Sequence, residues 1–373
     1  MMRTNILFFS VSIGSGHDSA AKSLEKSFLE KIPHANTKVI DTFDYINPTL
    51  NKVVVGSYME TLKFNPKVWG YLYQQAENGD RMVDLGQILN KLLSHKLQQL
   101  IDEFKPHAII CTHAFPAGMM SLVKAQMGLK VPVIVVLTDY TVHAFWIHPH
   151  VDYYVIPSDA LIYECVSKGM PREKIRPFGI PIRKEFSNPI DKNGMKQTLG
   201  LDERPVVLVM GGGLGLGAVQ ETVKTLLNTN PNLQIVAVAG KNKSLFSQLM
   251  KFKHAYKNLH VYGYAENIVE LMSAADLIIT KPGGLTSAEV LAKKLPMVIV
   301  DPLPGQEDRN TEFLLNWGVA VKTGKRSSLS ALINQLFGNG LRMKHMKEMA
   351  EYLAKPFAAE DISDFTIQIM TNK

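Results

Sequence analysis

The stretch that decides the fold reads TKPGGLTSAE over residues 280–289. It begins at the end of the apolar run Leu277–Thr280, which predicts a buried β-strand, and it leads into residues with helical spacing. Pro282-Gly283-Gly284 predicts a tight turn, after which Thr286 or Ser287 is expected to cap the helix. The free amides at such a helix start favour a diphosphate, and they bind it without a metal ion.

The same strand–turn–helix pattern recurs along the chain. Further strands are expected at Asn5–Val11, Thr37–Asp41, Ala108–Thr112, Val131–Leu137, Tyr153–Ile156, Val206–Met210, Gln234–Ala239, Leu259–Tyr262 and Met297–Val300. Helices are expected at Ser19–Lys31, Leu85–Phe104, Ala218–Leu227, Ser244–Lys253, Asn267–Ala274, Thr286–Lys293, Asn310–Asn316 and Pro356–Met370. Alternating strands and helices predict an α/β protein with parallel sheets.

The chain of 373 residues is long enough for two domains. A polar, broken stretch at 180–203 separates two halves with the same Rossmann-like alternation. We therefore predict a first lobe over residues 1–185 and a second over 186–355. A C-terminal helix over 356–373 is expected to return to the first lobe.

Composition and charge exclude several classes of protein. Hydrophobic residues make up 46% and charged residues 20%, which excludes disorder as the dominant state. The net charge of +7 is not gathered into a nucleic-acid-binding arm, but it permits contact with an anionic membrane. Two cysteines, Cys111 and Cys165, fit a reducing cytosol and small core positions. No apolar stretch reaches the ~18 residues of a membrane-spanning helix, and the apolar start predicts a strand in preference to a signal peptide.

A first candidate site is Gly14-Ser15-Gly16-His17, directly after the first strand. Gly14 and Gly16 let the backbone approach a ligand, and the helix that follows favours negative charge. His17 lies where α/β folds bind ligands, so it can accept a proton from a hydroxyl; alternatively, it caps its own helix. Asp139 follows another apolar strand and is the second candidate for this chemistry.

Two features of the first half have both a structural and a functional interpretation. His143, His148 and His150 suggest a metal, but without a helical H-x-x-x-H pair we favour a surface loop or a wall of the acceptor site. Residues 45–105 mix aromatic residues with lysines. They predict either helices packed on the first lobe or a patch that meets lipid headgroups.

The second half contains a glycine loop, Gly211–Gly217, after its first strand. Its amides, including that of Gly213, suit a phosphate or a sugar. The literal G-x-G-x-x-G pattern is absent, and Gly240-Lys241-Asn242 stands where a dinucleotide-binding fold has an acidic residue. Both departures argue against NAD.

Polar residues near the deciding stretch are suited to sugar hydroxyls. Glu289 is expected one turn into the helix, where it either binds a ribose or is a surface residue favoured by the helix dipole. Gln306, Glu307 and Asn310 are expected on a loop after the strand at 297–300. They either bind a sugar or cap the next helix.

Together, these motifs resemble those of the monogalactosyldiacylglycerol synthases and the processive diacylglycerol glucosyltransferases. The resemblance covers about residues 5–350 and is carried by GSGH with AA at 14–21, TDY and WIH at 138–148, GIPIR at 179–183, GGGLGLG at 211–217, GKN at 240–242, TKPGGLTSAE at 280–289 and PGQEDRN at 304–310. It implies a GT-B fold, in which two Rossmann-like lobes face an interlobe cleft. It also implies an inverting family-28 glycosyltransferase, cytoplasmic and peripheral to the inner face of the cell membrane.

The resemblance implies the substrates and the site residues as well. The expected donor is UDP-glucose or UDP-galactose, and the acceptor is diacylglycerol or a related lipid, with no cofactor, metal or nucleic acid. The donor site is expected to comprise the diphosphate contacts Gly283, Gly284, Leu285, Thr286 and Lys281, the ribose contact Glu289, the hexose contacts Gln306, Glu307 and Asn310, the uracil-facing Tyr264, and the loop residues Gly14, Gly16, Gly213 and Lys241. His17 or Asp139 is expected to act at the acceptor hydroxyl. The alternatives are a UDP-sugar 2-epimerase and a non-catalytic UDP-sugar sensor.

Overall fold

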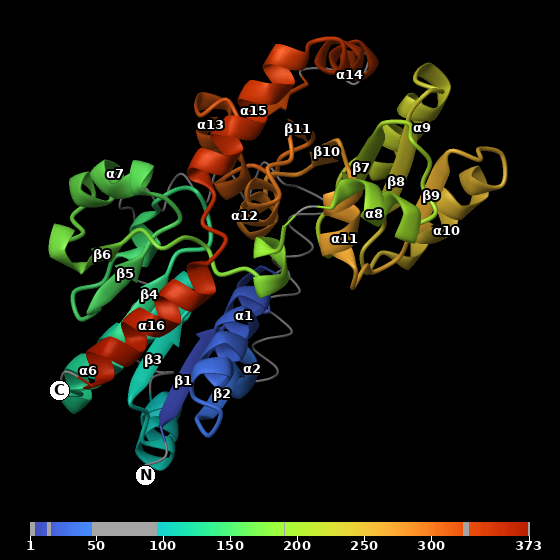
Figure 1. Ribbon diagram of the computed structural model, residues 1–373. Helices are drawn as coiled ribbons and strands as arrows, with labels where there is room; N and C mark the ends of the chain where they lie inside the picture. Colours follow the sequence, from blue (N-terminus) through green and yellow to red (C-terminus); the bar gives the residue numbers. More distant parts are fainter. Residues whose placement is uncertain (1–3, 13–15, 47–94, 190, 324–327, 372–373) are drawn as a thin grey trace. The chain divides into compact units, whose positions relative to one another are not determined.

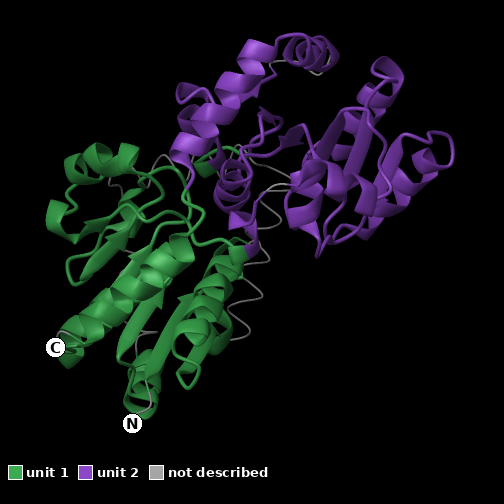
Figure 2. Cartoon of the chain, viewed as in Figure 1, with its two compact units in different colours: residues 1–184, 303–306, 355–373 green, residues 185–302, 307–354 purple. Residues whose placement is uncertain are grey.

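The computed structural model describes residues 4–12, 16–46, 95–189, 191–323 and 328–371. Gly14 and most of the aromatic segment 45–105 lie outside these residues. The chain divides into two compact units (Figure 2): residues 1–184, 303–306 and 355–373 form unit 1, and residues 185–302 and 307–354 form unit 2. Within the described residues, no helix is long and apolar enough to cross a membrane.

Unit 1 is built on a six-stranded parallel sheet with the strand order β2-β1-β3-β4-β5-β6 (Figure 1). Its strands are β1 (Asn5–Ser10), β2 (Asn36–Asp41), β3 (Ala108–Cys111), β4 (Val133–Val136), β5 (Tyr153–Val155) and β6 (Ile175–Arg176). Its helices are α1 (Gly16–Lys31), α2 (Thr42–Ile46), α6 (Ala114–Met127), α7 (Ile162–Ser167) and α16 (Ala358–Thr371), with short 3-10 turns η1 (Ala144–Trp146), η2 (Asp159–Leu161) and η3 (Arg172–Lys174). Residues 95–104 are also helical.

The C-terminal helix α16 completes the core of unit 1. Ile362 of α16 and Phe28 of α1 belong to one buried cluster with Phe8 of β1, so both helices cover the same face of the sheet (Figure 1). The Arg176 guanidinium lies 4.9 Å from the ring of Phe365 in α16, in cation–π contact. A segment at the end of the chain is thus part of the fold that begins with β1.

Unit 2 is built on a second six-stranded parallel sheet, with the order β12-β11-β10-β7-β8-β9. Its strands are β7 (Val206–Met210), β8 (Gln234–Val238), β9 (Leu259–Tyr262), β10 (Leu277–Thr280), β11 (Met297–Ile299) and β12 (Ala320–Lys322). Its helical elements are η4 (Lys184–Ser187), α8 (Lys192–Thr198), α9 (Val219–Thr229), α10 (Lys243–Lys253), α11 (Ile268–Ala274), α12 (Gly284–Ala292), α13 (Gln306–Asn316), α14 (Leu329–Phe337) and α15 (Gly340–Leu353). The first residue of η4 and the first residue of α13 are counted with unit 1. The predicted parallel α/β architecture is confirmed.

Each sheet reverses its strand order once, between β1 and β3 in unit 1 and between β7 and β10 in unit 2. In open parallel sheets, ligands bind outside the carboxyl ends of the strands at such a point. The loops after β1, β3, β7 and β10 are therefore the places to look for function.

Three predictions about local structure are wrong: the start of helix α12, the residue that caps it, and the start of helix α13. Helix α12 begins at Gly284 and its N-cap is Gly283, so neither Thr286 nor Ser287 caps it. The extended backbone of Gly283 (ψ 140°) leads directly into the helix, and both hydroxyl residues fall inside it. Helix α13 begins at Gln306 and not at Asn310, so the predicted polar loop is the first turn of a helix.

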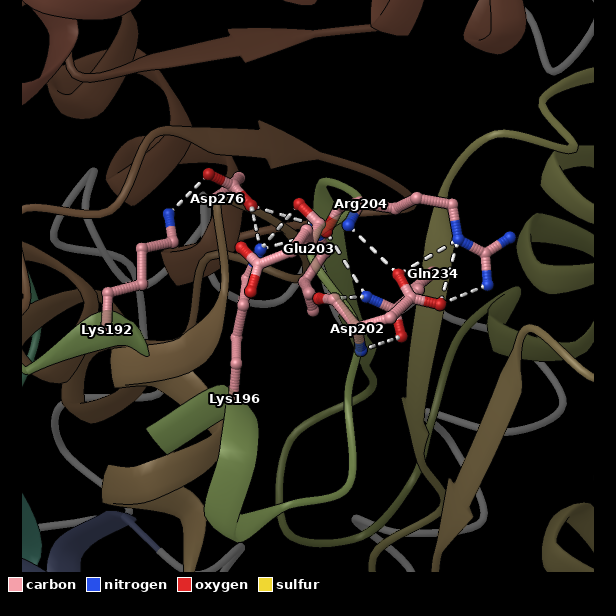
Figure 3. Close-up of polar contacts among 8 residues, drawn as sticks. Lys192, Lys196, Asp202, Glu203, Arg204, Gln234 and Asp276 are labelled. Atoms are coloured by element: carbon pink, nitrogen blue, oxygen red, sulfur yellow. Dashed lines mark hydrogen bonds and ion pairs between the residues drawn. The ribbon is translucent and has the colours of Figure 1, made fainter. Parts of the chain in front are cut away.

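A charged network holds the opposite, amino edge of the second sheet (Figure 3). The carboxylate of Asp276, just before β10, accepts a hydrogen bond from the Val206 N–H at 2.8 Å and forms an ion pair with Lys192. Lys196 is 9% exposed and donates to the Arg204 carbonyl at 2.9 Å. This network joins α8 to the amino ends of the strands, at the edge of the sheet opposite their carboxyl ends.

Asp276→Ala is expected to lower the free energy of unfolding by about 2–3 kcal/mol, because a charged acceptor is lost and the Val206 N–H and Lys192 lose their partner. Asp202→Ala is the matched control, since its ion pair with Arg204 is 51% and 42% exposed and solvent screening is expected to leave it little effect on stability. Urea unfolding measures both. Equal losses would mean that the Asp276 network does not hold the sheet edge.

Candidate active site

His17 lies in the first turn of α1, at the carboxyl edge of the first sheet. Its Nδ1 atom is 2.9 Å from the carbonyl oxygen of Thr112 and 2.9 Å from the hydroxyl of Thr138. A carbonyl oxygen can only accept, so Nδ1 carries the hydrogen. The neutral ring therefore has its lone pair on Nε2, which is the nitrogen available as a base.

Three neighbouring strands supply this arrangement. Thr112 and Thr138 follow the ends of β3 and β4, and the Thr112 hydroxyl donates to the backbone carbonyl of His17 at 3.1 Å. The ring of His113 packs edge-on against that of His17, with centroids 4.6 Å apart. Thr112, His113 and Thr138 were not predicted as site residues, although a histidine directly after the predicted strand Ala108–Thr112 was a visible signal.

Asp139 is partly buried and follows Thr138 in the same loop. The sequence predicted two alternative roles for Asp139: it is the base, or it orients His17. The orienting position at Nδ1 is occupied by the Thr112 carbonyl and the Thr138 hydroxyl. A part for Asp139 as the base stays a prediction.

His143 and His148 stabilise the loop in which they lie. His143 accepts a hydrogen bond from the Phe145 N–H at 3.1 Å, and His148 Nε2 lies 2.9 Å from the Phe145 carbonyl. Burial lowers the pKa of His148. Within the described ranges no group of three or more His, Cys, Asp or Glu residues is arranged to hold a metal ion. These contacts favour the loop interpretation of the histidines.

The glycine loop and the deciding stretch meet in unit 2. A Cβ atom at Gly217 would lie 3.3 Å from the Lys281 side chain, so the loop after β7 touches the turn after β10. These strands flank the point where the second sheet reverses its order. Two predicted motifs, 64 residues apart between Gly217 and Lys281, therefore lie next to each other.

A close approach within the chain requires glycine at position 215 of this loop. A Cβ on Gly215, whose φ is +60°, would lie 1.9 Å from the carbonyl oxygen of Ala239. The Gly213 carbonyl accepts from the Lys241 N–H at 2.9 Å, and Asn242 Nδ2 donates to the Gly215 carbonyl at 3.0 Å. The loop is thereby fixed to the segment after β8.

Gly215→Ala is expected to destabilise the protein more than Gly128→Ala does. The two glycines have nearly the same φ, +60° and +61°, but nothing lies within 4 Å of a Cβ at Gly128. Gly128→Ala should cost about 1–2 kcal/mol for the backbone conformation alone. Gly215→Ala should lower the free energy of unfolding by about 1–3 kcal/mol more, since Ala239 must move. Denaturant unfolding of both variants measures the difference, and equal costs would show that the approach is not tight.

Lys281 and Glu307 form a buried ion pair. Lys281 Nζ is 2.9 Å from Glu307 Oε1, and the two side chains are only 10% and 11% exposed. Asn310, fully buried, donates to the Pro282 carbonyl at 2.9 Å. Glu307 and Asn310 thus hold the turn after β10, and Gln306 begins the same helix.

Gly16, predicted as a donor residue, is the first residue of α1 in unit 1, and Gly14 lies outside the described residues. The other predicted donor residues lie near the same edge of unit 2 or on α12. The Lys241 ammonium is 5.7 Å from the ring centroid of Tyr264, which is 58% exposed, and the Gly240 N–H donates to the Gly263 carbonyl at 3.1 Å. Gly283, Gly284, Leu285 and Thr286 form the start of α12, which has no side-chain cap. Glu289 is partly buried in its second turn.

Solved structures show which class of fold this is. The MurG protein of Acinetobacter baumannii superposes with a TM-score of 0.62 over 98% of this chain and 99% of that chain, at 16% identity. The Staphylococcus aureus MnaA protein, solved with UDP, gives 0.63 over 100% of this chain and 97% of its own, at 14% identity. The fold class is GT-B, and that prediction is confirmed.

Sequence comparison then identifies the family. A processive diacylglycerol beta-glucosyltransferase from Bacillus mycoides is 31% identical over 96% of this chain and 92% of its own length. Residues 17–182 match the monogalactosyldiacylglycerol (MGDG) synthase family, and residues 206–364 match the glycosyltransferase family 28 C-terminal domain. The chain belongs to this family of glycosyltransferases, and the resemblance read from the sequence is confirmed.

Proposed function

We propose that this chain is an inverting glycosyltransferase that moves a hexose from a UDP-sugar to a diacylglycerol-type lipid and forms a β-glycolipid. The main support for this reaction is the hydrogen bond between His17 Nδ1 and the Thr112 carbonyl, which leaves Nε2 as the nitrogen that can take a proton. The relative from Bacillus mycoides is named a processive diacylglycerol beta-glucosyltransferase, which favours UDP-glucose over UDP-galactose as the donor.

Unit 2 is the proposed donor site. The uncapped amides of Gly283, Gly284, Leu285 and Thr286 bind the diphosphate, because a helix start favours negative charge. Glu289 binds the ribose and Tyr264 lies against the uracil. Lys281 and Glu307, held together by their ion pair, face the leaving phosphate and the hexose, with Gln306 and Asn310 in support.

Unit 1 is the proposed acceptor site. His17 Nε2 takes the proton of the lipid's primary hydroxyl while the oxygen attacks the anomeric carbon. The bond from that carbon to UDP breaks, and the electron pair leaves on the diphosphate. The helix amides stabilise the charge that develops there, and an α-linked donor gives a β-linked product.

The contact with a membrane follows from the acceptor. Diacylglycerol resides in a bilayer, and the net charge of +7 favours an anionic surface. We propose peripheral association with the inner face of the cell membrane, with no nucleic acid and no cofactor as partner.

The decisive experiment measures UDP release from UDP-glucose, UDP-galactose and UDP-N-acetylglucosamine, with EDTA present, with and without diacylglycerol liposomes. Lipid-dependent release with a new glycolipid from one donor is the expected result, and it names the sugar. Isomerisation of the donor without lipid would favour the 2-epimerase, and binding without turnover would favour the sensor.

A further inference from the structure

A second histidine, His113, lies next to His17 and has no role in the reaction proposed above. His113 follows β3 directly, and its ring plane lies at 79° to that of His17, with centroids 4.6 Å apart. Both side chains are only partly buried. The two imidazoles therefore stand together at the carboxyl edge of the first sheet, where such sheets bind their ligands.

His113 is fixed as a neutral hydrogen-bond donor. Its Nδ1 accepts a hydrogen bond from the Phe115 N–H at 3.1 Å, which caps helix α6. This nitrogen keeps its lone pair, so the hydrogen of the neutral ring is on Nε2. Burial, and then the charge of neighbouring His17, hold the pKa of His113 well below its usual range. A second proton would also break the cap and put a cation at a helix N-terminus.

The two rings are complementary. His17 carries its hydrogen on Nδ1 and offers an acceptor at Nε2, whereas His113 offers a donor at Nε2. Within the part of the chain that the structure describes, neither Nε2 atom has a hydrogen-bond partner. An attacking alcohol can use both groups. Its O–H donates a hydrogen bond to the acceptor, and one oxygen lone pair accepts a hydrogen bond from the donor. The other lone pair stays free for attack.

We propose that His113 is a second catalytic residue, whose Nε2–H binds the oxygen of the acceptor hydroxyl while His17 Nε2 takes the proton. This proposal rests on the proposed glycosyl transfer. The O–H bond breaks towards His17, the freed electron pair bonds the anomeric carbon, and the bond to UDP breaks. His113 keeps its own proton throughout and holds the oxygen in line. The pair accepts a neutral hydroxyl and rejects an ammonium group, which has no lone pair.

His113→Asn separates this role from the capping role. Asparagine is a strong N-cap, so its side-chain oxygen can accept from the Phe115 N–H, but it presents no ring donor next to His17. We expect an unchanged thermal midpoint, an unchanged KM for UDP-glucose, and a kcat for lipid glycosylation lower by at least about tenfold. The matched control is His107→Asn, because His107 Nδ1 accepts from the Asn5 N–H at 3.0 Å at the amino end of β1, and it should keep wild-type turnover.

The outcomes divide clearly. If His113→Asn is folded and turns over as the wild type does, while His113→Ala is unstable, His113 is a cap only and the inference is overturned. If the wild type itself gives no lipid-dependent UDP release from any donor, the proposed function fails and takes this inference with it.

Discussion

His17→Ala is expected to lower the kcat of glycosyl transfer by about 10³-fold and to leave UDP binding unchanged. In the proposed reaction the ring removes the proton, and its Nε2 lone pair is available because Thr112 and Thr138 hold the hydrogen on Nδ1. The diphosphate site is proposed in unit 2, so the loss should appear in turnover alone. Single-turnover product formation and UDP titration calorimetry measure the two quantities separately.

Two further variants serve as comparisons for His17→Ala. Thr138→Val should cost much less than His17→Ala, because the Thr112 carbonyl still accepts from Nδ1 and fixes the tautomer. His34→Ala, at an exposed position before β2, should have no effect on turnover. If His17→Ala keeps full turnover, His17 is not the base, and Asp139 becomes the group to test.

The sequence predicted most of the fold because buried parallel strands are short apolar runs with clear ends. The bounds of β7, β9 and β10 agree with the prediction residue for residue. By contrast, β6 and β12 span two and three residues and were not predicted, since such short runs have no periodicity to detect. The start of α12 was misplaced because Pro-Gly-Gly reads as a turn, whereas Gly283 adopts the extended conformation of an N-cap.

The candidate site could be predicted only in part, since sequence motifs do not state which loops are neighbours. Glu307 was expected to bind a sugar, but its contact with Lys281 depends on helix α13 packing next to the turn after β10. His113 was missed for a related reason. Its proposed role depends on the ring of His17, 96 positions earlier, which the reversal between β1 and β3 places next to it.

The Lys281–Glu307 pair supports a second prediction with a large effect. Glu307→Gln is expected to lower the free energy of unfolding by about 3–5 kcal/mol, because it leaves the Lys281 ammonium buried without a charged partner. Glu351→Gln is the control: its pair with Lys294 spans 2.5 Å, but the side chains are 61% and 44% exposed, so the loss should be under about 1 kcal/mol. Chemical denaturation measures both.

Ligand binding then separates the structural role of the pair from its proposed role at the diphosphate. Lys281→Met should lose at least about tenfold in UDP affinity, or about 1.4 kcal/mol, because the cation proposed to lie near the phosphates is gone. In Glu307→Gln the ammonium is released from its carboxylate partner, so saturating UDP should raise the thermal midpoint at least as much as in the wild type. The double variant Lys281→Met, Glu307→Gln should recover stability without recovering UDP affinity. Equal UDP binding by Lys281→Met and the wild type would make the pair a purely structural link between the turn after β10 and helix α13.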